Sequence, residues 1–237
     1  MELRFTIPVA QLSWFLLWIS GCGDPGATDP VAAGDGGVTP RTGEVRYLAM
    51  GDSISQGIGT PNFEAEAFPA RLSERWRAQG CKVELKNVGI AGYTAADLIA
   101  NEVPEIAPFK PTFITLQVGA NDIVNAVPIE TYRTQVRTIL DAAKKSGARV
   151  VVLPQNDWPR SPEGMYYEGA VANRAAFDDV FIEEAKAKSV ELLDLRPLYS
   201  QHADKKLWAE DGIHPTAACY DDVAAEIARV APSPCGK

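Results

Sequence analysis

Apolar and polar residues alternate along the chain in a way that predicts strands and helices in turn from residue 45 onward. Short, mostly apolar runs indicate strands at 45–50, 82–88, 112–118, 148–153 and 190–195. Longer segments whose apolar residues recur at helical spacing lie between and after them, at 67–79, 94–107, 128–146, 168–188 and 216–231. This alternation is typical of an α/β protein with a parallel sheet that helices cover on both faces.

The helix predicted at 168–188 shows how the inward and outward faces are assigned. Its spacing predicts that Val171, Ala175, Val180, Phe181 and Ala185 face inward, and that Asp178, Asp179, Glu183 and Lys188 face water. Two connections, 154–167 and 196–215, are longer than is usual in such folds. Both follow the carboxyl ends of strands, and we therefore expect both to form walls of a site at that edge of the sheet.

The N-terminal segment has the pattern of an export signal. Arg4 precedes an apolar stretch that ends at Ile19, which is too short and too interrupted for the ~20 apolar residues of a membrane span. The stretch ends in Ile19-Ser20-Gly21-Cys22, which resembles a bacterial lipobox whose cysteine is acylated. We therefore predict a signal peptide at 1–21 and a lipid anchor on Cys22. The alternative is an ordinary secretory signal and a secreted protein.

The sequence that follows Cys22 predicts a tether and then one folded domain. Residues 22–44 are rich in Gly, Pro, Asp and Thr and have almost no large apolar side chain. A flexible coil of this length has a root-mean-square reach of roughly 26 Å. The remaining residues, 45–237, are long enough for a single domain with a sizeable core.

The charge and histidine content exclude several classes of function. The formal net charge is −8, and Lys and Arg form no cluster, which argues against a nucleic-acid partner. With only two histidines, the chain lacks the imidazoles that a binuclear metallophosphoesterase usually needs, and no zinc-binding spacing of Cys or His occurs.

Candidate chemistry begins where the first predicted strand ends, at Gly51-Asp52-Ser53. A serine at the carboxyl end of a central strand is well placed to act as a nucleophile, although these residue types also favour plain turns. His214 is the candidate base because Asp211, three residues earlier, can reach its imidazole and fix the tautomer. His202 has no such neighbour, and we expect it in an exposed loop.

Four blocks together resemble the SGNH, or GDSL-type, hydrolase family. They are Gly51-Asp52-Ser53, the run from Asn87 to Gly92, Gly119-Ala120-Asn121-Asp122, and Asp211-Gly212-Ile213-His214. The resemblance implies a three-layer α/β/α, flavodoxin-like fold with a five-stranded parallel sheet. It further implies an acyl-enzyme mechanism without a cofactor, and a substrate that is a lipid ester, a thioester or an acetylated carbohydrate. We expect the protein to be a monomer.

The resemblance also implies a role for each matched residue. Ser53 would be the nucleophile, His214 the general base and Asp211 the group that orients the imidazole. The oxyanion hole would combine the backbone N–H groups of Ser53 and Gly89 with the side-chain amide of Asn121. We interpret the carboxylates of the remaining two aspartates in the blocks, Asp52 and Asp122, as acceptors for loop N–H groups.

Two other readings of the same residues remain. One is the elbow of an α/β-hydrolase, which requires Gly-X-Ser-X-Gly. Ser55 stands where the last glycine should be, which argues against this assignment. A non-catalytic, ligand-binding envelope lipoprotein could keep the same fold, although all three triad positions are occupied. Trp158, Met165, Tyr166 and Tyr167 in the segment 154–167 could line a substrate pocket or only pack the loop itself.

Three of the four cysteines lie in the predicted domain, at positions 81, 219 and 235. Cys219 and Cys235 are separated by the last helix, which at 1.5 Å per residue spans ~22 Å, too far for a disulfide. Cys81 opens the second strand at the amino edge of the sheet, where the last helix also ends. We therefore predict a Cys81–Cys235 disulfide and a buried free thiol at Cys219, in a compartment where disulfides persist.

Overall fold

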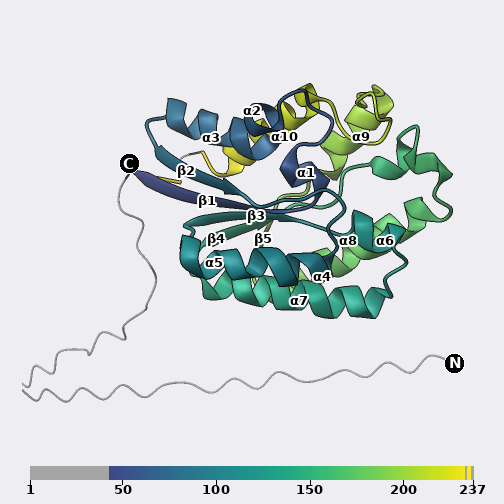
Figure 1. Ribbon diagram of the computed structural model, residues 1–237, viewed down its shortest axis with the longest axis horizontal. Coiled ribbons are helices and arrows are strands. Elements are labelled where there is room, and N and C mark those ends of the chain that lie inside the picture. Colours follow the sequence, from purple (N-terminus) through teal and green to yellow (C-terminus); the bar gives the residue numbers. More distant parts are fainter. Residues whose placement is uncertain (1–42, 233, 236–237) are drawn as a thin grey trace, which may run out of the picture. The chain divides into compact units, whose positions relative to one another are not determined.

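A computed structural model describes residues 43–232 and 234–235, and the predicted signal peptide and nearly all of the predicted tether lie outside this part. Five parallel strands form one sheet in the order β2-β1-β3-β4-β5 (Figure 1). The strands are β1 (Glu44–Gly51), β2 (Lys82–Asn87), β3 (Phe113–Gln117), β4 (Arg149–Val152) and β5 (Glu191–Leu192). The sequence prediction of a parallel α/β fold is thus confirmed.

Helices connect successive strands and follow the last one. The α-helices are α1 (Ser53–Gln56), α2 (Phe63–Glu66), α3 (Phe68–Ala78), α4 (Ala95–Asp97), α5 (Val103–Phe109), α6 (Ala120–Val124), α7 (Ile129–Lys145), α8 (Ala170–Ala187), α9 (Arg196–Asp204) and α10 (Ala217–Val230). A π-helical turn, η1 (Leu98–Glu102), joins α4 to α5, and the 3₁₀ turns η2 (Trp158–Arg160) and η3 (Gly164–Tyr166) follow β4. None of the helices in the described residues is long and apolar enough to cross a membrane.

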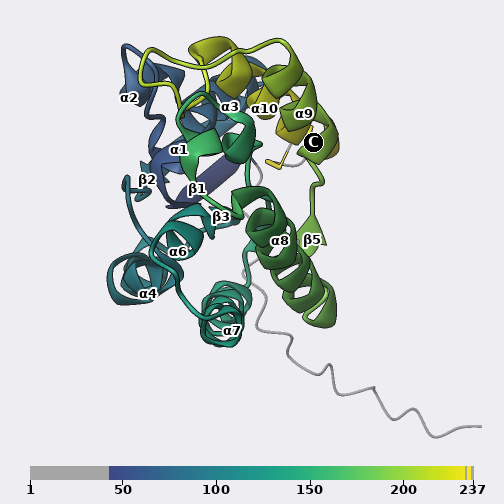
Figure 2. The same ribbon diagram turned by 90° about the vertical axis from the view of Figure 1, so that its right-hand side faces the viewer.

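The sheet lies between two helical layers because its central strands are apolar on both faces. Along β1, Leu48 and Met50 pack into a cluster with residues of α5, α7 and α8. Tyr47 and Ala49 point the other way and pack with residues of α3 and α10. This alternation is the period of two expected of a strand, and Figures 1 and 2 show the two layers on opposite sides of the sheet.

The predicted orientation of α8 is wrong at three positions. Val171 and Ala175, both expected inside, are exposed, and Asp178, expected outside, is 1% exposed. The carboxylate of Asp178 accepts a hydrogen bond from the Gln155 N–H at 3.1 Å and lies 3.7 Å from the guanidinium Nε of Arg174. A polar network at the end of β4 therefore decides which face of this helix is buried.

The segment after β5 also differs from the prediction of a long connection. Residues Arg196–Asp204 form α9, with a proline in the first turn, where its missing N–H costs nothing. The expectation that His202 lies in an exposed loop is wrong, because it is buried on α9. Its Nε2 lies 3.0 Å from a carboxylate oxygen of Asp222 on α10, so this histidine links two helices.

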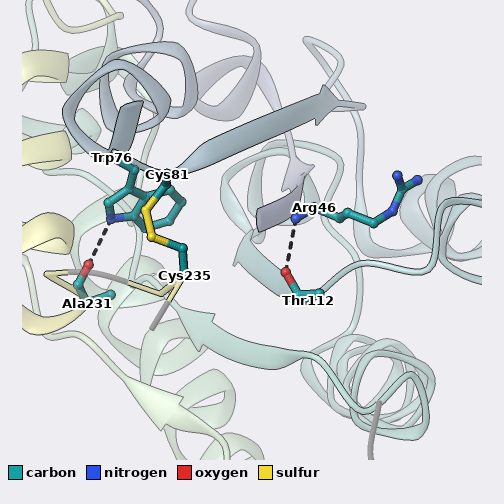
Figure 3. The surroundings of a disulfide bond; sticks show 6 residues. All are labelled: Arg46, Trp76, Cys81, Thr112, Ala231 and Cys235. Atoms are coloured by element: carbon teal, nitrogen blue, oxygen red, sulfur yellow. Dashed lines mark hydrogen bonds between the residues drawn. A yellow bond between two sulfur atoms is a disulfide. The ribbon is translucent and has the colours of Figure 1, made fainter. Parts of the chain in front are cut away.

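The two ends of the domain meet at the amino edge of the sheet. Cys81 and Cys235 form a disulfide with a Cα–Cα distance of 5.7 Å, the pairing that the sequence predicts (Figure 3). Beside it, the Trp76 indole N–H donates to the Ala231 carbonyl at 2.8 Å. Cys219 is a buried free thiol. The disulfide therefore fixes the chain end to the sheet at the edge opposite the carboxyl ends of the strands.

Candidate active site

A cavity of about 180 Å³ lies at the carboxyl edge of the sheet, which faces the reader in Figure 2. Its walls come from all four loops that follow β1 to β4 and from the turn before α10. The lining residues are Asp52, Ser53, Ile54, Ala91, Gly92, Ala120, Asn121, Val124, Asn156, Trp158, Tyr167, Ile213 and His214. The topology thus brings the four sequence blocks to one place, as expected for the carboxyl edge of an open α/β sheet.

Ser53 reaches this cavity through a sharp turn at the end of β1. Gly51 has a φ of 146°, and a Cβ there would lie 2.4 Å from the Gln117 carbonyl oxygen, so only glycine fits. Asp52 then caps α1, its carboxylate accepting from the Ile54 N–H at 3.0 Å. Ser53 is therefore the first residue of α1, half-buried and part of the cavity wall.

The imidazole of His214 is held by Asp211. Nδ1 of His214 donates to one carboxylate oxygen of Asp211 at 2.7 Å, and the other oxygen accepts the N–H groups of Ile213 and His214, each at 3.0 Å. Partial burial acts to raise the pKa of Asp211, but these N–H groups and the imidazole outweigh it and lower the pKa below its ordinary value. Asp211 is therefore an ionised acceptor that fixes the ring and leaves Nε2 as the proton acceptor.

Ser53 and His214 both line the cavity wall. Among the described residues, no hydrogen bond joins the two side chains. Catalytic hydrogen bonds are often long in proteins without bound substrate and shorten in the complex. The geometry therefore gives an Asp211–His214 pair and a serine in one cavity, rather than a closed triad.

Asn121 presents an amide to the same cavity from the start of α6. Its Nδ2 donates one hydrogen to the Tyr93 carbonyl at 2.9 Å, which fixes the orientation of the amide. The amide nitrogen carries two hydrogens, so the second is left for a ligand. The structure places Asn121 in the wall of the cavity that Ser53 also lines.

Gly89 does not line the cavity that Ser53 lines. Its N–H donates to the Asn87 side-chain oxygen at 3.1 Å, and Gly89 lines a different cavity with Phe63 and Leu85. Gly92, three residues later in the same block, lines the Ser53 cavity, and its N–H has no hydrogen-bond partner among the described residues. The backbone donor that this block can offer to a substrate is therefore that of Gly92.

Asp52, Asp122 and Glu102 are buried carboxyl groups, and Asp52 interacts electrostatically with the other two. Burial raises the pKa of Asp52 to about 7, the Ile54 N–H opposes this shift, and the charge of Asp122 adds to it. Burial also raises the pKa of Asp122 to about 6, against the Ala95 N–H, which lies 3.1 Å from both of its oxygens. Both aspartates accept backbone N–H groups, as predicted. Glu102 is the third buried carboxyl, and the sequence analysis did not find it.

The outer wall of the cavity is apolar and is tied to the histidine turn. Trp158 is buried with its ring edge-on to Tyr167, at 5.7 Å between centroids. The Glu163 N–H donates to the Gly212 carbonyl at 3.0 Å, which joins the loop after β4 to the turn that carries His214. Tyr166 is nevertheless 79% exposed. A hydrogen-bonded loop thus holds large apolar side chains at the mouth of the cavity.

Among residues 43–232 and 234–235, no group of three or more His, Cys, Asp and Glu is arranged to hold a metal ion. The cavity combines a serine at the end of a strand, an imidazole oriented by a carboxylate, and free N–H donors. This combination defines the class of serine hydrolases that act on acyl groups.

Similarity to known proteins makes the assignment more specific. The GDSL-like lipase/acylhydrolase family matches residues 49–221. An arylesterase of Vibrio mimicus is 25% identical over 190 residues, covering 78% of this chain and 86% of the relative. Esterase TesA of Pseudomonas aeruginosa is 26% identical over 153 residues, covering 62% and 75%. A crystal structure of TesA superposes with a TM-score of 0.66 at 23% identity, covering 80% of this chain and 98% of that structure.

The chain therefore belongs to the GDSL-like lipase/acylhydrolase family, and it is a carboxylic ester hydrolase with the fold of that family.

Proposed function

We propose that Ser53 is the nucleophile of this ester hydrolase, that His214 is its general base and acid, and that Asp211 orients the imidazole. The observation that carries this proposal is that Ser53 and His214 line one cavity while Asp211 holds His214 Nδ1 at 2.7 Å. His214 Nε2 takes the proton of Ser53 Oγ as the oxygen attacks the ester carbonyl, and returns it to the leaving alcohol. Water then cleaves the acyl-serine by the same steps.

The oxyanion of the tetrahedral intermediate needs preorganised donors. We propose the backbone N–H groups of Ser53 and Gly92 and the free amide hydrogen of Asn121. The N–H of Ser53 belongs to the first turn of a helix, where it has no partner within the helix. This assignment keeps the predicted roles of Ser53 and Asn121 and replaces Gly89, whose N–H is already bonded to Asn87.

For the substrate, we propose an ester with an apolar acyl or aryl group. Val124, Trp158 and Tyr167 contribute apolar surface to the cavity wall, and the neighbouring residues Met165 and Tyr166 are exposed. The names of the relatives, arylesterase and esterase, agree with such a substrate. A chain-length series of aryl esters should show kcat/KM rising from the acetyl ester to longer acyl groups. Preference for acetylated xylan over the whole series would contradict the proposal.

A fluorophosphonate probe tests the nucleophile directly, because it phosphonylates an activated serine and then stays attached. Mass spectrometry of the labelled protein should place the adduct on the peptide that contains Ser53. A purified, folded protein that hydrolyses no ester and takes up no probe would instead be a binding protein, the alternative that shares this fold.

We also propose that the protein is exported and anchored through a lipid on Cys22. The described chain begins at the edge of the sheet opposite the cavity, where the Gly43 N–H donates to the Cys235 carbonyl at 2.8 Å. The disulfide fits an oxidising compartment outside the cytoplasm. A diacylated Cys22 in the mass spectrum of the mature protein is the expected result, and an unmodified N-terminal residue would favour secretion.

We also propose that the enzyme acts as a monomer. Sedimentation of the purified protein at the concentration of the activity assay measures this, and an active species that exists only as an oligomer would contradict it.

A further inference from the structure

Glu102 stands out as an acidic side chain in an otherwise apolar helical face. It is the last residue of the π-helical turn η1 and is 1% exposed, while Ala95, Leu98 and Ile106 on the same face all belong to the apolar core. A π-helical turn inside a helix frequently marks a functional site. An isolated buried carboxyl group is costly unless it is hydrogen-bonded, so its presence calls for a reason.

The carboxyl group of Glu102 contacts the backbone that leads into the nucleophile. Its Oε2 accepts a hydrogen bond from the Gly51 N–H at 2.8 Å. Gly51 lies two residues beyond Ala49, which forms the last pair between β1 and β2. The side chain of Glu102 thus supplies an acceptor where the β1–β2 ladder has ended, directly before Asp52 and Ser53.

Gly51 also connects to the loop that carries the proposed oxyanion donor. The Gly51 carbonyl accepts from the Ile90 N–H at 3.2 Å, two residues before Gly92. The turn is closely packed, because a Cβ on Gly51 would lie 2.6 Å from Ser55 Oγ. A shift of Gly51 would therefore move Ser53 relative to Gly92.

The second oxygen of Glu102 is left without a partner. Oε1 is buried and has no hydrogen bond among the described residues. Burial raises the pKa of Glu102 to about 9, the Gly51 N–H opposes this shift, and the charge of Asp52 adds to it. Glu102 is therefore a neutral acid near pH 7, and a neutral amide would have nearly the same shape and the same accepting oxygen.

We propose that Glu102 is a positioning residue for ester hydrolysis, whose hydrogen bond to the Gly51 N–H sets the position of Ser53 relative to the oxyanion donors. The inference rests on the proposed role of Ser53 as the nucleophile. A carboxyl group retained only for the fold would contribute to stability, whereas a positioning group must change the rate of the chemical step.

Three variants of the full-length protein separate these roles. Glu102→Leu and Glu102→Met remove the acceptor and keep an apolar side chain of similar size. Glu102→Gln keeps the acceptor. The matched control is Glu105→Leu, the same change at a partly exposed position of α5 whose carboxylate pairs with Lys86 on β2. Circular dichroism and thermal melts establish which variants are folded, and the two apolar variants give the same comparison if one of them fails to fold.

We expect kcat on an aryl ester to fall about 10- to 100-fold in the apolar variants, the usual effect of misplacing a reacting group, with little change in KM. Glu102→Gln should keep kcat within about threefold of the wild type, since its amide oxygen accepts the same N–H. A folded apolar variant with the kcat of the wild type would overturn the proposal, as would a Gln variant as slow as the Leu variant.

The rate of fluorophosphonate labelling distinguishes this inference from the proposed function. If the wild type is not labelled at Ser53, the nucleophile assignment fails. If wild type and apolar variants are labelled at the same rate, the nucleophile assignment stands and only the role of Glu102 is rejected.

Discussion

Removing the Cys81–Cys235 disulfide should destabilise the domain and leave its catalytic rate intact. The bond closes a loop with a sequence separation of 154 residues, and this loop contains strands β2 to β5. It lies at the amino edge of the sheet, whereas the cavity lies at the carboxyl edge. A double Cys81→Ala, Cys235→Ala variant therefore separates stability from activity.

The size of the effect follows from the length of the closed loop. The chain-entropy relation gives about 5 kcal/mol for a loop this long, and measured losses for native disulfides run from about 2 to 5 kcal/mol. Trp76 and Ala231 remain hydrogen-bonded beside the site at 2.8 Å, so part of the local packing survives. For a domain of this size, the loss corresponds to a Tm decrease of about 4 to 20 °C.

Thermal unfolding of oxidised wild type, reduced wild type and the double variant measures this decrease. Reduction should bring the wild type close to the double variant and leave the double variant unchanged. Cys219→Ser is the matched control, because that thiol is buried but unpaired with another cysteine. A double variant that melts with the oxidised wild type, or a reductant that lowers the Tm of the double variant equally, would refute the reasoning.

Three further predictions concern the cavity. Asn121→Ala should lower kcat by ~10²–10³ with a much smaller change in KM, the usual effect of deleting one oxyanion donor; an effect on KM alone would show ground-state binding instead. Asp211→Asn should lower kcat by up to ~10⁴, because the amide favours the wrong tautomer of His214, and steady-state kinetics near neutral pH measure this. Burial raises the pKa of Asp52 from 3.8 to about 7, so the folded state binds this proton more tightly than the unfolded state, and stability is lost as pH rises from about 4 through 7. Urea titrations measure the difference in unfolding free energy between Asp52→Asn and the wild type. This difference should favour the variant more at pH 8 than at pH 4, and an equal difference at both pH values would contradict the prediction.

The architecture was predictable because strands buried on both faces leave long apolar runs and amphipathic helices leave a periodic pattern. The segment Arg196–Asp204 was missed as a helix because a long, charged connection hides its few apolar positions, Tyr199 and Ala203. The face of α8 was misjudged at Asp178 because its burial depends on the Gln155 N–H, a partner far away in sequence. Periodicity records average burial and carries no information on such polar contacts.

The site could be located from its four blocks, but the roles inside a block could not all be assigned. Gly89 and Gly92 stand three residues apart in one run, and only the contact of Gly89 with the Asn87 side chain shows which N–H is free. Glu102 did leave a signal in the sequence, an acidic residue in the apolar face of the helix predicted at 94–107. Its hydrogen bond to Gly51 depends on the fold.

The turnover of Ser53→Ala tests the central claim most directly. The variant should fold like the wild type, with the same circular dichroism and Tm, because Ser53 is only half-buried and its side chain makes no hydrogen bond among the described residues. Its kcat on an aryl ester should fall at least a thousandfold, since members of a catalytic triad act as a unit worth orders of magnitude. A folded Ser53→Ala protein that keeps more than about a thousandth of the wild-type kcat would contradict the assignment of Ser53 as the nucleophile.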